Sequence, residues 1–252
     1  MRRALVTGAS AGIGRALSVA LVQAGVEVFG TGRDAEALGA TREVAGAGFH
    51  PLVADITVAM DRGTIRERLG ERPLDFLVHG AGIFPRGLLR GLSMDDWRAA
   101  MATNVDARLH LVMDLRPRLQ DGRVLFIGSD AASNPRPGGA AYSVSKAASA
   151  MLYQCLALEL GEEISFAIVR PGLVATRMME ESIRAPREGF PAGEVYDAMV
   201  REGKTIAPGT IACFLSWLLL DLSADGFSGE WDVRDASHHA HWLRGSLFRP
   251  PA

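Results

Sequence analysis

The sequence of 252 residues predicts an α/β fold: a doubly wound parallel sheet of about seven strands with helices on both faces. Two observations support this prediction. Short apolar or β-rich segments alternate with longer segments of helical character, and strand candidates such as 124–127 (Val-Leu-Phe-Ile) are apolar at every position. Alternation of strands and helices favours parallel pairing, and parallel strands covered on both faces lack the polar alternation of half-exposed strands.

The expected elements follow one another without an internal repeat or a linker, so we expect a single dinucleotide-binding and catalytic domain spanning 1–252. Strands are expected at Ala4–Thr7, Val26–Thr31, Phe49–Ala54, Phe76–His79, Val124–Gly128, Ile164–Arg170 and Glu230–Val233. Helices are expected at Ile13–Ala24, Ala35–Ala45, Val58–Leu69, Met94–Leu119, Ala141–Leu160 and Pro208–Leu220. The segment 177–207 breaks this rhythm, and long excursions in compact domains are usually functional. We expect a substrate lid there, helical around Glu194–Arg201, with a surface insertion as the alternative.

The composition excludes several function classes. The 27 basic and 29 acidic residues give a net charge of −2, which argues against partners such as nucleic acid or an anionic membrane surface. The longest apolar segment, Ile211–Leu222, is too short to span a bilayer. The first residues show no apolar signal segment, so we expect a cytoplasmic enzyme. Cys155 and Cys213 lie in apolar helical segments and are expected to be buried thiols.

A glycine-rich turn follows the first expected strand directly. Gly8, Gly12 and Gly14 permit a tight turn, close approach of the backbone to a pyrophosphate, and close helix packing. The helix that begins near Ile13 points its N-terminal amides toward the phosphates. Three glycines alone are a weak signal, but their position between a strand and an amphipathic helix is the context that a Rossmann-type dinucleotide site requires.

Tyr142 and Lys146 are four residues apart at the start of an expected helix, so both side chains lie on one helical face. A nearby ammonium group favours tyrosinate and is expected to lower the pKa of the phenol. A phenol tuned in this way can exchange a proton with a carbonyl or hydroxyl group. Ser129, just beyond the fifth expected strand, is placed to hydrogen-bond the same substrate oxygen.

In combination, these motifs make the chain similar to the short-chain dehydrogenase/reductase family over nearly its whole length. The matching motifs are Thr-Gly-x-x-x-Gly-x-Gly at 7–14, Asp55-Ile56, Asn104, Ser129, Tyr-x-x-x-Lys at 142–146, and Pro171-Gly172 followed by Thr176. The resemblance implies that Tyr142 is the general acid in reduction and that Ser129 orients the substrate oxygen. It further implies that Lys146 holds the nicotinamide ribose and that Asn104 positions a water molecule.

The resemblance and the ends of the expected strands together define the candidate cofactor site, because ligands of open α/β sheets bind at the carboxyl edge. No metal site is expected. The candidate cofactor-binding residues are Gly8, Ser10, Gly12, Ile13, Gly14, Arg33, Asp55, Ile56, Ala81, Gly82, Tyr142, Lys146, Pro171, Gly172, Val174 and Thr176.

The chain departs from the family pattern after the fourth expected strand. The usual Asn-Asn-Ala-Gly reads His79-Gly80-Ala81-Gly82 here, so the hydrogen bonds of the asparagines are lost. We expect His79 to be a hydrogen-bonded core histidine, and the alternative is that it replaces one asparagine. The frequent Asp-Gly-Gly near the C-terminus is also absent, and 231–235 (Trp-Asp-Val-Arg-Asp) stands there.

Residues at the end of the second expected strand favour NADP(H) over NAD(H). An acidic residue at the strand end accepts the ribose 2′-hydroxyl of NAD, whereas arginine accommodates the 2′-phosphate of NADP. The position of the selecting acid is Gly32, and Arg33 follows with a fork suited to phosphate. Asp34 is better explained as the N-cap of the helix at 35–45. NAD(H) is kept as the alternative.

The candidate substrate residues are mostly apolar and flexible, which suits a small carbonyl compound. Arg136 either pairs with a carboxylate or is an exposed loop residue. The order of lid and tail is faintly similar to sepiapterin- and benzil-reductase-like family members. The candidate substrate residues are Phe84, Pro85, Arg136, Met178, Met179, Phe190 and Tyr196.

The C-terminal tail combines histidines with large apolar side chains. A metal site needs defined ligand geometry, so for His238, His239 and His241 we expect a polar tail helix or a subunit contact instead. The resemblance implies a homodimer or homotetramer built on the helices at 94–119 and 141–160. The apolar side chains, which we expect to pack against the body or another subunit, are Trp242, Leu247 and Phe248.

The sequence is therefore compatible with three functions. The leading one is NADPH-dependent reduction of a small ketone or aldehyde to an alcohol. The second is alcohol oxidation by an NAD-dependent dehydrogenase. The third is a non-catalytic protein that senses dinucleotides, and the presence of Ser129, Tyr142 and Lys146 argues against it because a sensor needs no tuned phenol.

Overall fold

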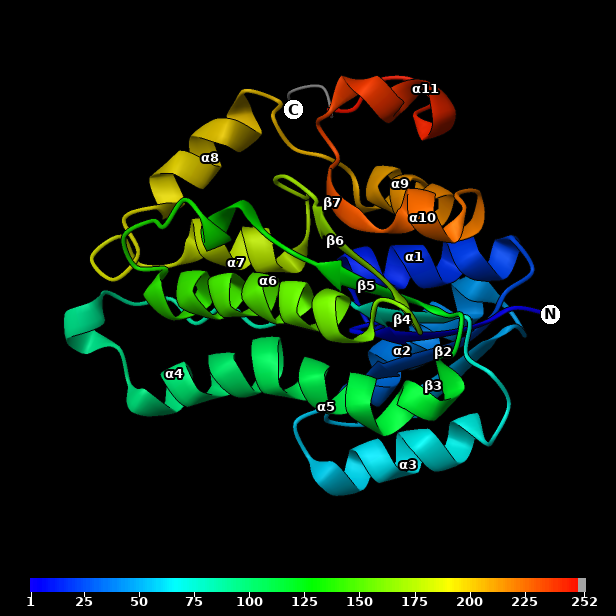
Figure 1. The fold of residues 1–252 in the computed structure, drawn as a ribbon. Coiled ribbons are helices and arrows are strands. Elements are labelled where there is room, and N and C mark those ends of the chain that lie inside the picture. The colour runs from blue at the N-terminus through cyan, green and yellow to red at the C-terminus, as the bar shows by residue number, and fades with distance from the viewer. Residues whose placement is uncertain (249–252) are drawn as a thin grey trace.

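The computed structural model describes residues 1–248, and the last four residues of the expected 1–252 domain lie outside this range. Within it the chain forms a seven-stranded, wholly parallel sheet in the order β3-β2-β1-β4-β5-β6-β7 (Figure 1). This confirms the predicted fold class. The strands are β1 (Arg3–Thr7), β2 (Glu27–Gly32), β3 (Phe49–Val53), β4 (Phe76–His79), β5 (Arg123–Ile127), β6 (Ser165–Arg170) and β7 (Gly229–Asp232).

Two hydrophobic cores lie on opposite faces of the sheet, because successive side chains of a strand point to opposite sides. In β1, Ala4 and Val6 belong to one core and Leu5 belongs to the other. Helices α1 and α9 cover the first face, and α3, α5 and α6 cover the second (Figure 1). The helices around the sheet are α1 (Gly12–Gln23), α2 (Ala35–Ala45), α3 (Ala59–Leu69), α5 (Ala107–Leu115), α6 (Ala140–Leu160) and α9 (Pro208–Leu220).

The helix predicted at Met94–Leu119 is interrupted. It consists of α4 (Met94–Met101), a π-helical turn (Ala102–Asp106), α5 and a 3-10 turn (Arg116–Arg118). Asn104 lies buried in the π turn, where its amide bonds the backbone of the loop after β4. A π turn accommodates one extra residue in a helix, and this is what the simple 3.6-residue pattern missed.

The segment 177–207 contains two helices, α7 (Arg177–Arg184) and α8 (Gly193–Arg201). The second confirms the helix expected around 194–201, whereas α7 was not predicted. Exposed Arg–Glu pairs four residues apart accompany α7, with Arg177 Nε 2.9 Å from Glu181 Oε1. A parallel bridge between Val174 and Ile206 joins the two ends of the segment.

The tail packs on the body through an aromatic cluster. The ring of His238 stacks on Phe214 with centroids 5.0 Å apart, and Trp242 Nε1 donates to His238 Nδ1 at 2.8 Å. Trp242 is buried, as predicted, and Leu247 packs against the same core. The 248 described residues contain no group of side chains suited to a metal ion. This part is built from α10 (Ala224–Phe227), β7, a 3-10 turn (Ala236–His238) and α11 (His239–Trp242).

The prediction of two buried thiols is wrong. Cys155 on α6 and Cys213 on α9 are both exposed, because each occupies the helix side that faces away from the sheet. An apolar helical segment therefore indicated the helix correctly without fixing which side each residue occupies. None of the helices within residues 1–248 combines the length and apolarity needed to cross a bilayer.

Candidate functional site

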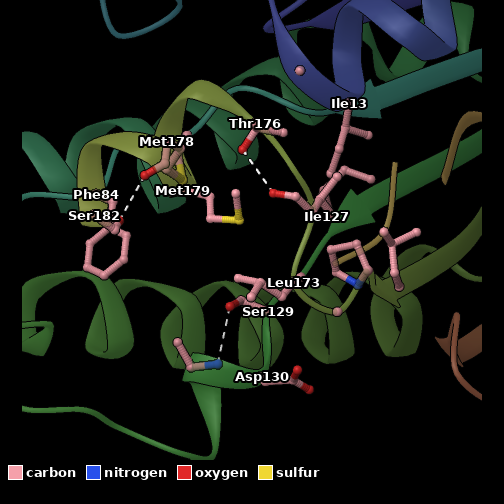
Figure 2. Close-up of a pocket in the computed structure, with 18 of the residues that line it drawn as sticks. Ile13, Phe84, Ile127, Ser129, Asp130, Leu173, Thr176, Met178, Met179 and Ser182 are labelled. Atoms are coloured by element: carbon pink, nitrogen blue, oxygen red, sulfur yellow. Dashed lines mark hydrogen bonds between the residues drawn. The ribbon is translucent and has the colours of Figure 1, made fainter. Parts of the chain in front are cut away.

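A cavity of about 630 Å³ opens at the carboxyl edge of the sheet. The loops after β1, β4, β5 and β6 line it, together with residues of α7 and α8. Figure 2 shows Ile13 of α1 at one side and Phe84 with Met178 at the other, with Ser129 between them in this view. The order reverses between β1 and β4, and such a switch point is where open α/β sheets bind ligands.

The turn after β1 is closely packed against the loop after β4. Gly8 has a φ of +74°, and a Cβ there would lie 2.8 Å from the backbone nitrogen of Ala81. A Cβ on Gly14 would overlap the carbonyl oxygen of Gly8. Thr7 Oγ1 links the two loops, donating to Val78 O at 3.2 Å and accepting from Ala81 N at 3.1 Å. The glycines therefore bring two loops and a helix start together, as the sequence predicts.

The start of α1 fits a phosphate group. No side chain caps its first turn, and the turn contains no acidic residue. The free amides at a helix N-terminus and the helix dipole both favour an anion there. Gly12 and Ile13, which begin α1, line the cavity together with Thr176 from the loop after β6. The residues present therefore fit the pyrophosphate of a dinucleotide.

Ser129, Tyr142 and Lys146 come together at the cavity. Ser129 follows β5 and caps a 3-10 turn (Asp130–Ala132), accepting a hydrogen bond from Ala131 N at 3.2 Å. Lys146 is buried and donates from Nζ to the carbonyl oxygen of Ile127 at 2.8 Å. Its Nζ lies 5.5 Å from the centre of the Tyr142 ring. The structure confirms that Tyr142 and Lys146 lie on the same face of α6. Their catalytic roles remain predictions.

The pKa of Tyr142 differs from the expected direction. Burial raises the pKa of the phenol above 10, and the Ser129 hydrogen bond and the charge of Arg108 lower it by less. Lys146 does not supply the expected lowering, because burial and the charge of Arg108 hold the pKa of its amine well below the usual range. The expectation that Lys146 lowers the phenol pKa in the free protein is therefore wrong. At neutral pH the phenol holds its proton.

Asn104 is buried behind the cavity and does not line it. Its Oδ1 accepts from Ile83 N at 3.0 Å, and its Nδ2 donates to Ile83 O at 3.0 Å and to Ser145 Oγ at 2.8 Å. Asn104 thus joins the loop after β4 to α6, the helix that carries Tyr142. The implied water-positioning role stays a prediction.

His79 is fully buried at the end of β4, but it is not hydrogen-bonded. Neither ring nitrogen has a partner among the described residues, and the ring packs on Phe126 with centroids 4.7 Å apart. The expectation of a hydrogen-bonded core histidine is therefore wrong in that respect. Burial, with the charge of Arg108, holds the pKa of His79 well below its usual value, so the ring is neutral.

Arg33, Asp55 and Ile56 lie apart from the cavity lining. Arg33 is exposed just after β2, with Nη1 3.9 Å from Asp55 Oδ2. Burial raises the pKa of Asp55, but hydrogen bonds from Thr57 outweigh this and the net shift is downward. The Ile56 side chain packs in the core. Asp34 caps α2 by accepting from Ala37 N at 3.0 Å, as predicted.

Aromatic side chains gather at the far end of the cavity. Phe84 stacks on Tyr142 with centroids 4.2 Å apart, and Arg136 lies over the ring of Tyr196 at 5.7 Å. Phe190 is buried behind Phe84 in edge contact, so it supports the wall from behind. Of the predicted substrate residues, five line the cavity and Phe190 and Pro85 do not. The five are Phe84, Arg136, Met178, Met179 and Tyr196.

Sequence reasoning missed several residues of this site. Leu173 and Met199 line the cavity from a loop and from α8, and nothing in their local sequence marks them. Phe248, which was expected only to pack against the body or another subunit, is 42% exposed and lines the cavity from the tail. Arg108 is buried behind the cavity. Its signal was available, because an arginine interrupts an otherwise largely apolar helical segment at 107–112.

Comparison with protein-family models gives a match to the short chain dehydrogenase model over residues 2–187. The chain is 36% identical over 236 residues to 2,3-dihydro-2,3-dihydroxybenzoate dehydrogenase of Escherichia coli, covering 87% of this chain and 90% of the relative. It is 35% identical over 199 residues to the rhamnolipids biosynthesis 3-oxoacyl-[acyl-carrier-protein] reductase of Pseudomonas aeruginosa, covering 74% and 78% respectively.

Solved structures of short chain dehydrogenases also resemble this chain. A short chain dehydrogenase from Burkholderia cenocepacia in complex with NADP superimposes with a TM-score of 0.77 at 29% identity, covering 91% of this chain and 94% of that one. A short chain dehydrogenase/reductase from Saccharomyces cerevisiae superimposes with a TM-score of 0.86 at 24% identity, covering 96% and 100%, and supports the fold alone.

Proposed function

The chain belongs to the short-chain dehydrogenase/reductase family and is an oxidoreductase, and we propose that it reduces a small ketone or aldehyde to an alcohol with NADPH. The observation that carries this proposal is the meeting of Ser129, Tyr142 and Lys146 at one cavity with the uncapped start of α1. The aromatic end of the cavity suits an apolar carbonyl compound.

In this proposal the glycine-rich turn and the start of α1 hold the pyrophosphate, and Lys146 holds the nicotinamide ribose. The loops after β4 and β6 form the rest of the cofactor site. A nicotinamide dinucleotide bound there supplies the hydride. The proposed cofactor residues at the cavity are Gly8, Ser10, Gly12, Ile13, Gly14, Ala81, Gly82, Tyr142, Lys146, Pro171, Gly172, Val174 and Thr176.

Tyr142 acts as the general acid and gives its phenolic proton to the substrate oxygen. Burial favours the protonated phenol before the reaction, which is the state that a reductase needs. Ser129 orients the same oxygen with its hydroxyl. Asn104 fixes the loop after β4 relative to α6. On the family resemblance, it also positions a water molecule.

The segment 177–207 acts as the substrate lid in this proposal. Met178 and Met179 of α7 and Tyr196 of α8 line the cavity, so movement of these helices changes the substrate site directly.

We propose that the protein forms a homodimer or homotetramer through the helices at 94–119 and 141–160. Apolar side chains are exposed on these helices, namely Met94, Met113, Met151 and Leu158. We also propose that the protein is cytoplasmic.

Arg33→Ala tests the cofactor preference. The guanidinium group is exposed after β2 and forms charge-assisted bonds with the 2′-phosphate in this proposal. Losing them weakens NADPH binding roughly tenfold or more and leaves NADH binding nearly unchanged. The measurement is the Kd of each cofactor by fluorescence titration. Arg66→Ala, which removes an exposed arginine of α3, is the charge-matched control. An unchanged ratio of Kd values in Arg33→Ala contradicts the assignment.

A panel of small carbonyl compounds, followed by loss of NADPH absorbance, tests the reaction itself. We expect turnover of apolar ketones or aldehydes, including aromatic ones that fit beside Phe84. Turnover only of alcohols with NAD would favour the dehydrogenase alternative. Cofactor binding without any turnover in either direction would favour the dinucleotide sensor.

A further inference from the structure

Arg108 is a buried cation directly behind the candidate site. Its side chain is 1% exposed, and its guanidinium group reaches from α5 between the sheet and α6. Nη2 donates to the carbonyl oxygen of Ala81 at 3.2 Å. Nη1 donates to the carbonyl oxygen of Ile127 at 3.3 Å and to Ser149 Oγ at 2.9 Å. One side chain therefore joins the loop after β4, the end of β5 and the helix that carries Tyr142.

Arg108 and Lys146 share an acceptor. The carbonyl oxygen of Ile127 accepts from Arg108 Nη1 and from Lys146 Nζ, the latter at 2.8 Å. Within residues 1–248, no Asp or Glu side chain contributes a counter-charge to Arg108 or to Lys146. Burying a cation without a counter-charge is costly. The cost would be offset where an anion forms during the reaction, and the charge of Arg108 acts on Tyr142.

The groups around Arg108 come from three elements. The charge of Arg108 acts on Tyr142 and Lys146 of α6 and on His79 of β4. The Phe126 ring of β5 lies 5.8 Å from its guanidinium carbon. Burial lowers the pKa of Arg108, but its three hydrogen bonds to oxygen acceptors favour the charged form, so the guanidinium group stays protonated through a tyrosine titration. The other charged or titratable groups acting on Tyr142 are Tyr196 and Arg86.

We propose that Arg108 is a positioning residue whose buried charge stabilises the phenolate of Tyr142 and whose hydrogen bonds fix the carbonyl oxygen that anchors Lys146. This rests on the proposed function. With the carbonyl carbon receiving the hydride that a bound nicotinamide dinucleotide would supply, Tyr142 gives its proton to the substrate oxygen. The phenol then becomes an anion and the substrate becomes an alcohol. Arg108 keeps its own protons and changes only the energy of that anion.

The sign of the effect follows from the charge. A fixed cation favours phenolate over phenol and neutral amine over ammonium, so it lowers the pKa of both Tyr142 and Lys146. Removing it raises both pKa values. A purely structural arginine, by contrast, would affect stability without moving the Tyr142 titration.

The direct test is an ultraviolet titration of tyrosinate in the free protein, which needs neither substrate nor cofactor. The chain has only three tyrosines, and subtracting the curve of Tyr142→Phe isolates the Tyr142 component. In Arg108→Gln, which keeps amide donors and removes the charge, we expect the Tyr142 titration to move to higher pH. Arg108→Lys keeps the charge and should leave it close to the wild-type position.

The kinetic test uses the pH profile of kcat for carbonyl reduction. Arg108→Gln should lower kcat on the order of tenfold, and it should move the alkaline limb to higher pH with little change in the KM for NADPH. Ser149→Ala removes one partner of Arg108 without changing the charge, and it should leave the limb in place.

An unmoved Tyr142 titration in Arg108→Gln overturns the proposal, whatever happens to kcat. If Arg108→Gln does not fold, Arg108→Met is titrated instead, with the same expected shift and the same overturning result. Because the titration uses free protein, it remains decisive even if the carbonyl panel fails. Loss of the proposed function and loss of this inference are therefore distinguishable.

Discussion

Tyr142→Phe is expected to lower kcat for carbonyl reduction by roughly 10²- to 10⁴-fold, the usual contribution of general acid catalysis. The substitution removes the phenolic oxygen that holds the transferred proton and keeps the ring. That ring stacks on Phe84 with centroids 4.2 Å apart, so the shape of the pocket is preserved. The Kd for NADPH should therefore change little. Steady-state kinetics and fluorescence titration measure the two effects separately.

Tyr153→Phe is the matched control, since Tyr153 lies on α6 as Tyr142 does, but its ring is buried in the hydrophobic core. It should leave kcat almost unchanged. Retained activity in Tyr142→Phe would contradict the assignment of the general acid. A fall in kcat of equal size in both variants would point to damage to α6 and not to lost proton transfer.

Gly14→Ala is expected to have the second large effect. A Cβ at this position would overlap the carbonyl oxygen of Gly8, and backbone atoms cannot move aside as a side chain end can. The turn must open, which destabilises the fold by about 1–3 kcal/mol. Opening also displaces the amides proposed to bind phosphate, so the Kd for NADPH should rise at least tenfold. Denaturant unfolding and fluorescence titration give the two numbers.

Gly39→Ala is the control for this prediction. Gly39 lies inside α2, and a Cβ added there would meet open space, so alanine should stabilise the helix by up to about 1 kcal/mol. Cofactor binding should not change. If Gly14→Ala bound NADPH as tightly as Gly39→Ala does, the glycine-rich turn would not be the phosphate site.

The elements that the sequence predicts well are those whose signal is local. Most of the seven strands are apolar or β-rich segments with a turn beside them, and Gly8, Gly12 and Gly14 mark their loop by the conformations they permit. The pairing of Tyr142 with Lys146 also follows from helical spacing alone. In these cases the physical cause lies within a few residues of its effect.

The parts that the sequence leaves open depend on distant contacts. The ring of His79 is buried without partners because of what surrounds it, and no neighbour in the sequence indicates this. The pKa of Tyr142 rises because burial outweighs nearby charges, a balance that spacing cannot weigh. Phe248 joins the cavity from the far end of the chain.

The π-helical turn at 102–106 has a consequence for anyone who would redesign this scaffold. One additional residue there puts the helical wheel of α4 out of phase with that of α5. Forcing the turn into regular α-helix while keeping every residue would rotate the downstream part by about 100°. Either Asn104 or the buried face that carries Arg108 would then turn away from its partners. The π turn sets the rotation of α5 relative to α4. A regular α-helix of the same length would separate residues that this fold keeps in contact.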